Sequence, residues 1–194
     1  MFSEQTLQEL QNMDITLSYT HDLSEKEKLD VKNMYETNLE RPGTRTSKDQ
    51  IFMDTLRGYM CELALDRCIT NCIDNAPVTK GAVGLSYEQR KTDKIIDGLK
   101  TEIKSWNTSF VYTMPMTLSQ RKSIESAVPF NDFFIVMAWT QIKKLRYRIR
   151  PFYVVKANTI QSCFKKIDWP YAKIGVDTPR LLRYNENIEL QQDT

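Results

Sequence analysis

Two carboxylates and a lysine lie close together in one short segment of the sequence, TDKIIDGLKTEIKSWN, residues 92–107. The dipeptide Asp97-Gly98 at its centre favours a two-residue hairpin turn, because a type I′ turn requires positive φ at both central positions. This turn places Asp93 opposite Glu102, with Cβ atoms about 5 Å apart, a separation at which like charges are unfavourable. A divalent cation between the two carboxylates would convert this repulsion into coordination. The segment therefore predicts a cation site on a β-hairpin.

The register of this hairpin also predicts which side chains share a face. Because side chains alternate along a strand, one face receives the carboxylates and two lysines, and the other receives apolar residues. The first face holds Asp93, Ile95, Lys100, Glu102 and Lys104, and the second holds Lys94, Ile96, Leu99 and Ile103. An ammonium group would therefore lie beside the carboxylate pair.

The order Asp93, eight residues, then Glu102-x-Lys104 on two strands resembles the PD-(D/E)xK nucleases, which have the restriction-endonuclease-like fold. In that family an upstream helix usually carries a glutamate. Residues 57–65, RGYMCELAL, are typical of such a helix, and Glu62 is its candidate. The resemblance covers roughly residues 50–140.

The resemblance implies a DNA endonuclease that depends on Mg²⁺, for which Mn²⁺ can substitute. The metal ligands that it implies are Asp93, Glu102, the backbone carbonyl of Ile103 and Glu62, with Lys104 completing the catalytic set. Lys104 would either orient and deprotonate the nucleophilic water or offset developing negative charge, and the sequence does not choose between these roles. Glu62 would hold water around the metal or bind a second ion. A homodimer that cuts both strands is implied by analogy.

Other interpretations of these residues stay open. Asp93, Glu102 and Lys104 are residue types that ordinary solvated strands carry, and Glu62 could form an ion pair with Arg57 or Arg67. A non-catalytic DNA-binding or interaction protein on a degenerate nuclease fold is the main alternative. The hairpin register, the helix glutamate and the resemblance together favour the nuclease. Whether the substrate is DNA or RNA, and whether cutting is internal or terminal, stays open.

Binding to nucleic acid must depend on local clusters of charge, because the formal net charge is only +2. Residues 143–158 alternate between basic and apolar side chains, which predicts a strand with one basic face. The residues that we expect to contact phosphates are Lys100, Lys144, Arg146, Arg148 and Arg150. The alternative is an edge strand that its charges protect from aggregation.

Composition places the chain among intracellular proteins. No apolar run approaches the roughly 20 residues that cross a membrane, and the polar, acidic N-terminus is unlike a secretory signal. The four cysteines are Cys61, Cys68, Cys72 and Cys163, and the first three fall in one predicted helix. We expect reduced thiols in a cytoplasmic core, and zinc is less favoured because His21 is the only histidine.

With 194 residues, of which 41% are hydrophobic, the chain suits an α/β fold with a packed core. The prediction is a restriction-endonuclease-like core, a mixed sheet of four or five strands flanked by helices, over residues 48–194. Residues 1–47 are expected to form a helical N-terminal extension, in which Ser24 and Glu27 match a capping box. The remaining predicted elements are a helix from Lys48 to Cys72, a strand within 110–118, a helix at 119–127 and an apolar strand at 131–142.

Overall fold

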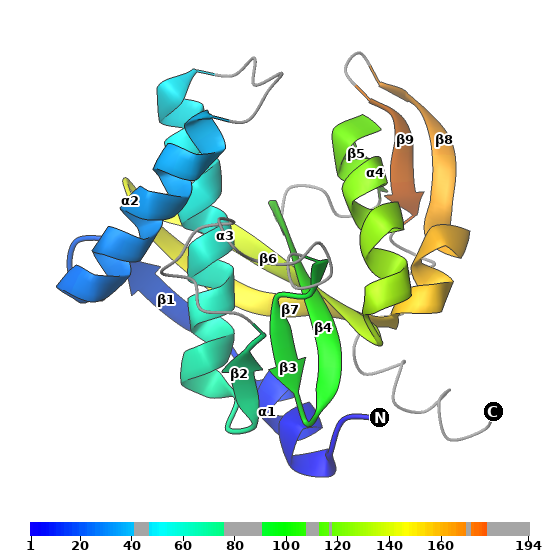
Figure 1. The fold of residues 1–194 in the computed structure, drawn as a ribbon, viewed down its shortest axis with the longest axis horizontal. Coiled ribbons are helices and arrows are strands. Elements are labelled where there is room, and N and C mark those ends of the chain that lie inside the picture. Colours follow the sequence, from blue (N-terminus) through cyan, green and yellow to red (C-terminus); the bar gives the residue numbers. More distant parts are fainter. Residues whose placement is uncertain (41–46, 76–90, 108–112, 117, 170–171, 178–194) are drawn as a thin grey trace.

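The computed structural model describes residues 1–40, 47–75, 91–107, 113–116, 118–169 and 172–177 (Figure 1). Within residues 1–107 the elements are α1 (Glu4–Asn12), β1 (Ile15–Ser18), α2 (Glu25–Leu39), α3 (Lys48–Cys68), β2 (Cys72–Asp74), β3 (Lys94–Ile96) and β4 (Leu99–Asn107). They are followed by β5 (Thr113–Met116), α4 (Leu118–Ala127), η3 (Val128–Phe130), β6 (Phe133–Lys143), β7 (Arg146–Lys156), η4 (Ala157–Cys163), β8 (Phe164–Trp169) and β9 (Ala172–Asp177).

The main sheet is mixed and contains six strands in the order β1-β7-β6-β4-β3-β2. Strands β4 and β6 are parallel and are connected through α4, whereas the other neighbours are antiparallel. The predicted α/β class is confirmed, but the predicted number of four or five strands is wrong. The strand predicted within 110–118 is β5, which belongs to a separate sheet of order β5-β9-β8, and residues 110–112 and 117 lie outside the described part.

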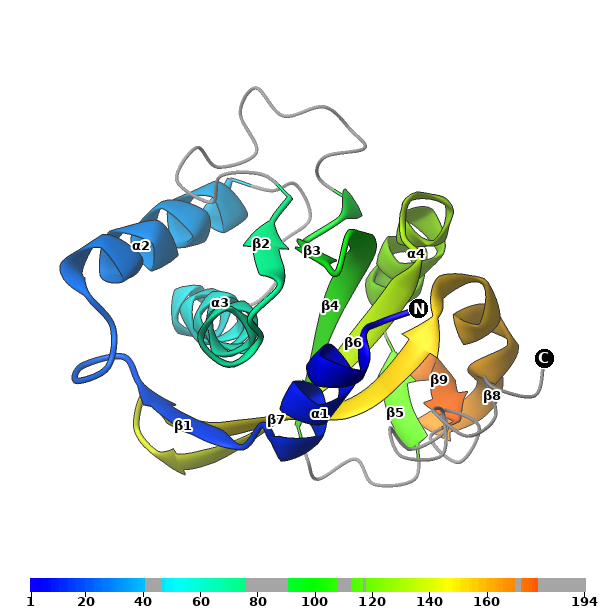
Figure 2. The same ribbon diagram turned by 90° about the horizontal axis from the view of Figure 1, so that it is seen from below.

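Helices α3 and α4 lie on opposite sides of β4 (Figure 2). One buried cluster packs α3 against residues such as Ile96, Ile103 and Ile135, and a second packs Ile124 of α4 against Phe134 and others. Phe133–Ala138 of β6 are all buried, as the apolar run predicts for a central strand. The two faces of the hairpin β3–β4 therefore point into two different environments.

Helix α3 begins after Ser47, whose hydroxyl accepts a hydrogen bond from the Gln50 backbone N–H, and it ends at Cys68. The predicted end at Cys72 is wrong, because Ile69 has extended backbone angles and Cys72 pairs with Ile96 as the first residue of β2. The thiols of Cys61, Cys68 and Cys72 are free, but only the first two are in the helix.

Besides helices α1 and α2, the N-terminal segment contains a strand that was not predicted, β1, which pairs with β7 at one edge of the main sheet. The predicted capping box of α2 is confirmed: Ser24 Oγ accepts from the Glu27 N–H, and the Glu27 carboxylate accepts from the Ser24 N–H at 2.6 Å. Leu17 and Val31 belong to the same buried cluster as Leu56 of α3. Residues 1–40 thus contribute to the core that supports the hairpin.

No helix in the described ranges has the length and apolar character needed to cross a membrane.

Candidate active site

The hairpin turn forms as its sequence predicts. Asp97 and Gly98 have φ values of 51° and 78°. Ile96 pairs with Leu99, and the ladder continues through Ile95–Lys100 and Lys94–Thr101. The turn dipeptide has therefore set the register, and Lys94 lies on the face opposite Glu102.

Beyond this ladder the structure corrects the prediction, because Asp93 does not form the expected backbone pair with Glu102. The Asp93 N–H donates to the Thr101 carbonyl at 3.2 Å, and β3 begins only at Lys94. Instead, the Asp93 carboxylate accepts a hydrogen bond from the Ile103 N–H at 2.7 Å. The side chain of Asp93 thereby takes the place of a backbone acceptor and is fixed against β4.

Glu102 and Lys104 share the face that packs toward α4, as predicted. The Lys104 ammonium contacts Glu102 Oε1 at 2.5 Å and Ser123 Oγ of α4 at 3.5 Å. Glu102 is 6% exposed, and its second oxygen, Oε2, is buried without a hydrogen-bond partner among the described residues. A buried carboxylate oxygen is normally satisfied, so this one leaves a position for a donor or a cation.

Burial sets the electrostatics of the site. The pKa of Glu102 is raised to about 8, because burial and the Asp93 carboxylate raise it by more than the Lys104 ammonium lowers it. Burial likewise raises the pKa of Asp93, against the lowering effects of Lys104 and the Ile103 N–H. Burial lowers the pKa of Lys104, but Glu102 and Asp93 outweigh it and the pKa rises. One ammonium thus faces two carboxylates that repel each other.

Glu62 lies on α3 and forms neither of the alternative ion pairs. Arg57 contacts Asp54 at 3.0 Å, and Arg67 contacts Glu27 at 3.0 Å. Burial raises the pKa of Glu62 well above its usual value, and the nearby Asp93 carboxylate adds to the shift. Within the described ranges, however, no three or more His, Cys, Asp or Glu side chains are grouped as a metal site. Glu62 is therefore electrostatically linked to Asp93 without joining it and Glu102 in one compact cluster.

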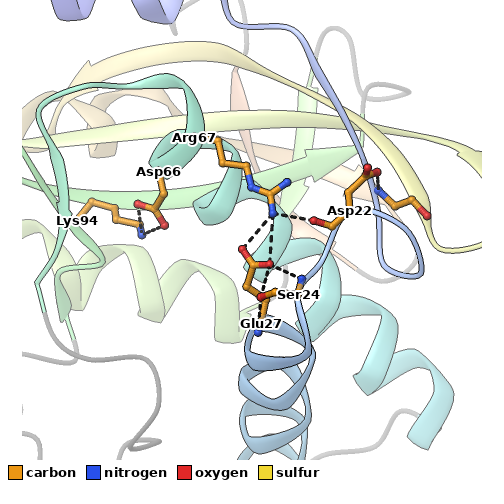
Figure 3. A network of polar contacts seen from close by, with 7 residues as sticks. Asp22, Ser24, Glu27, Asp66, Arg67 and Lys94 are labelled. Atoms are coloured by element: carbon orange, nitrogen blue, oxygen red, sulfur yellow. Dashed lines mark hydrogen bonds and ion pairs between the residues drawn. The ribbon is translucent and has the colours of Figure 1, made fainter.

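An ion-pair network on the other face of the hairpin is absent from the sequence prediction. Lys94 is 1% exposed, and its ammonium donates to both carboxylate oxygens of Asp66 at 2.7 Å (Figure 3). It also donates to Asp74. The sequence contains one indication of this network. Lys94 falls on the same face of the hairpin as the apolar Ile96, and a lysine on a buried face requires acidic partners.

The basic residues of β7 alternate in burial as predicted: Arg146, Arg148 and Arg150 are exposed, whereas Tyr147 and Ile149 are buried. Strand β7 lies between β6 and β1, so the edge-strand alternative is wrong. The pairing of Trp106 with Ala138, and of Ala138 with Arg150, places the arginines on the same face of the sheet as Glu102 and Lys104.

The other two predicted phosphate contacts are exposed but lie at opposite ends of the sheet. Lys144 lies between β6 and β7, next to the arginines. Lys100 lies beside the hairpin turn, where β4 and β6 begin. The basic residues therefore form a cluster on β7 and a separate lysine.

No family model, curated protein or solved structure matches this chain. The candidate function is therefore argued from the geometry of Glu102, Lys104 and their neighbours.

Proposed function

We propose that this chain is a metal-dependent deoxyribonuclease, an endonuclease that hydrolyses DNA phosphodiester bonds with a PD-(D/E)xK-like site. The observation that carries the proposal is the buried, unpartnered Oε2 of Glu102, next to the Asp93 carboxylate. An ion pair that served only stability would be expected to satisfy both oxygens of a buried carboxylate. Here one oxygen binds the Lys104 ammonium, and the other lies buried beside the Asp93 carboxylate, where a cation would offset the charge of both groups.

The donor set fits Mg²⁺ or Mn²⁺, which prefer oxygen ligands. Glu102 Oε2, Asp93 and the Ile103 carbonyl would hold the ion, and Glu62 would reach it through water. When bound, the ion would lower the pKa of a coordinated water and offset charge on the phosphate. The Ile103 N–H fixes the Asp93 carboxylate at 2.7 Å, which limits its reorientation before the ion arrives.

In this proposal Lys104 would lie next to the reacting phosphate. It is held by Glu102 and by Ser123 of α4, so its ammonium has a defined position. Its raised pKa keeps it protonated at neutral pH, which favours a role in offsetting negative charge on the transition state over one as general base. We propose that substitution of Lys104 by alanine keeps metal affinity but removes turnover.

DNA would approach from the face of the sheet that carries Glu102. Arg146 and Arg150 are exposed on this face and are suited to contact phosphates, with Lys144 beside them and Lys100 at the hairpin end. The arginines lie across the sheet from Trp106 of β4, two strands away on β7. Contacts with a polynucleotide would therefore continue from the site across β6 to β7.

The test is nicking of a supercoiled plasmid by the purified protein in Mg²⁺, in Mn²⁺ and in EDTA. We expect nicking only with metal, and none from Asp93→Ala or Glu102→Ala. Glu36→Gln, an exposed acidic position on α2, is the matched control and should cut like wild type. A wild-type protein that binds DNA but cuts with neither metal would instead support a non-catalytic DNA-binding protein. Linear duplex, single-stranded DNA and RNA, tested side by side, would define the substrate.

Cleavage of both strands by such a site would use two copies, and we propose a homodimer on DNA by analogy with other two-strand cutters. Light scattering after gel filtration, with and without duplex, would measure the mass. A monomer under both conditions would limit the activity to nicking of single strands.

A further inference from the structure

A cavity of about 390 Å³ lies on the face of the sheet opposite Glu102, between α2, α3, β2 and β3. Five acidic residues and two lysines are among the residues that line it. The lining residues that matter for its chemistry are Asp30, Tyr59, Glu62, Leu63, Asp66 and Asp74. The cavity therefore has an excess of negative charge.

Most of this charge is already neutralised by specific partners. The Lys94 ammonium is bound by Asp66 and Asp74. Glu27 is bound by Arg67 and by the Ser24 N–H (Figure 3). Lys94 shows that this region can hold an ammonium group between carboxylates. The acid left over on α2 is Asp30.

Asp30 is 5% exposed, and its Oδ1 has no hydrogen-bond partner in the part of the chain that the structure describes. Burial raises the pKa of Asp30, and the Glu27 and Asp74 carboxylates add to the shift, whereas the Lys26 ammonium on the same helix lowers the pKa only in part. A buried polar oxygen without a partner is costly, so Asp30 lowers the stability of the fold when the cavity holds no ligand. A cationic ligand in the cavity would supply what Asp30 lacks.

The lining favours an organic ammonium ligand over a bare metal ion. The described carboxylates do not form a group of three or more suited to a metal, and the cavity volume is far larger than one ion. Tyr59 and Leu63 add an aromatic ring and an aliphatic side chain to the acidic groups. Carboxylates beside an aromatic ring are suited to an ammonium group, and apolar side chains to its alkyl chain.

We propose that this cavity binds an aliphatic amine, with the ammonium group at Asp30 and the alkyl chain along Tyr59 and Leu63. The proposal goes beyond nuclease activity and does not depend on it. Glu62 is the one residue that belongs to both the cavity and the candidate active site.

The experiment is calorimetric titration of the full chain with putrescine near neutral pH, in the absence of DNA. Butanediol, which has the same chain without charge, and MgCl₂ are titrated separately. We expect putrescine to bind wild type, and Asp30→Asn to weaken it about tenfold or more, as for loss of a hydrogen bond between charged groups. Glu36→Gln, on the same helix but exposed, should leave the affinity unchanged.

Thermal unfolding provides a second readout. Putrescine should raise the unfolding temperature of wild type but not that of Asp30→Asn, and this variant should be at least as stable as wild type without ligand. No binding of putrescine, equal binding of butanediol, or binding of Mg²⁺ alone at Asp30 would overturn the proposal. An equal loss of affinity in Glu36→Gln would also overturn it, by showing non-specific attraction. Because the titration contains no DNA, its failure leaves the nuclease proposal standing, and a failed nicking assay leaves the amine site standing.

Discussion

Lys94 and Lys104 lie on the same hairpin, on opposite faces, and each is close to two carboxylates. Lys94 is bound by Asp66 and Asp74, whose side chains are 33% and 41% exposed. Lys104 is bound by Glu102, whose side chain is only 8% exposed, and is close to Asp93. The two sites contain the same types of group. They differ in how far water reaches the carboxylates.

At Lys94 the carboxylates keep contact with water while their ammonium is fully buried. Burial lowers the pKa of Lys94, but the hydrogen bonds to Asp66 and Asp74 outweigh this effect and raise it. At Lys104 the carboxylates themselves are buried and close to each other, and Glu102 Oε2 has no partner among the described groups. The first arrangement is complete as a structural ion pair, whereas in the second a buried carboxylate oxygen has no partner among the described groups. This difference is why we assign function to only one of them.

The largest expected effect is on DNA cleavage. Glu102→Gln keeps the shape of the side chain but removes the charge at Oε2, and it should lower the rate of plasmid nicking by about a thousandfold. Asp66→Asn removes a carboxylate beside the other lysine and should change the rate by less than about threefold, because Asp74 still binds Lys94. Similar rates for the two variants would end the distinction between the sites.

The second effect is on stability, and here the substitution at Lys94 should have the larger effect. Lys94→Met leaves the Asp66 and Asp74 carboxylates close together without a cation, and we expect a loss of about 2 kcal/mol in the free energy of unfolding, less than for a fully buried ion pair because both carboxylates contact water. Lys104→Met should cost about 1 kcal/mol or less, because Glu102 can take up a proton in place of the lost partner. Urea unfolding at pH 7 measures both. A larger loss for Lys104→Met would identify its ion pair as the structural one.

A third effect sharpens the comparison through pH. The pKa of Glu102 rises from its ordinary value of 4.5 to about 8 in the folded chain, so the folded state favours the protonated form. Glu102 therefore contributes full stability below pH 4.5, and this contribution is lost as pH rises toward 8. Glutamine stays neutral, so Glu102→Gln should exceed wild type in unfolding free energy by about 1–3 kcal/mol at pH 7.

This difference should disappear in acid and should be reduced by Mg²⁺, which stabilises only wild type by binding the ionised site. Unfolding temperatures measured from pH 4 to pH 8, with and without the metal, test both statements. A variant less stable than wild type at pH 7 without metal would show that Glu102 is ionised and satisfied by Lys104.

The parts of the fold that could be predicted from sequence are those that local chemistry determines. The positive φ of Asp97 and Gly98 sets the turn, and the turn sets the register of β3 and β4. Pairing between distant segments has no such local signal. Strand β1 pairs with β7 across more than a hundred residues, and no glycine or proline near Ile69 marks the end of α3.

The candidate site divides in the same way. Spacing and alternation place Glu102 and Lys104 on one face and Lys94 on the other, as the structure shows. The bond from the Ile103 N–H to the Asp93 carboxylate, and the unpartnered oxygen of Glu102, depend on where the ladder ends and on the packing of α4. These are tertiary effects, and residue types alone do not reveal them.

The smallest expected effect concerns binding of DNA to β7, where the arginines are not equivalent. Arg148 binds Asp14 through two hydrogen bonds, at 2.8 and 2.5 Å, so part of its charge is already neutralised. We expect Arg146→Gln and Arg150→Gln each to reduce the slope of log Kd against log salt by about one unit, the contribution of one phosphate contact. Arg148→Gln should change the slope less, and Asp14→Asn should steepen it by freeing Arg148.

Fluorescence anisotropy of a labelled duplex at several salt concentrations, with EDTA present to prevent cleavage, measures these slopes. Equal slopes for all four variants and wild type would show that DNA does not contact this face. A reduction of the slope by a full unit in Arg148→Gln would mean that the bond from Arg148 to Asp14 opens when DNA binds.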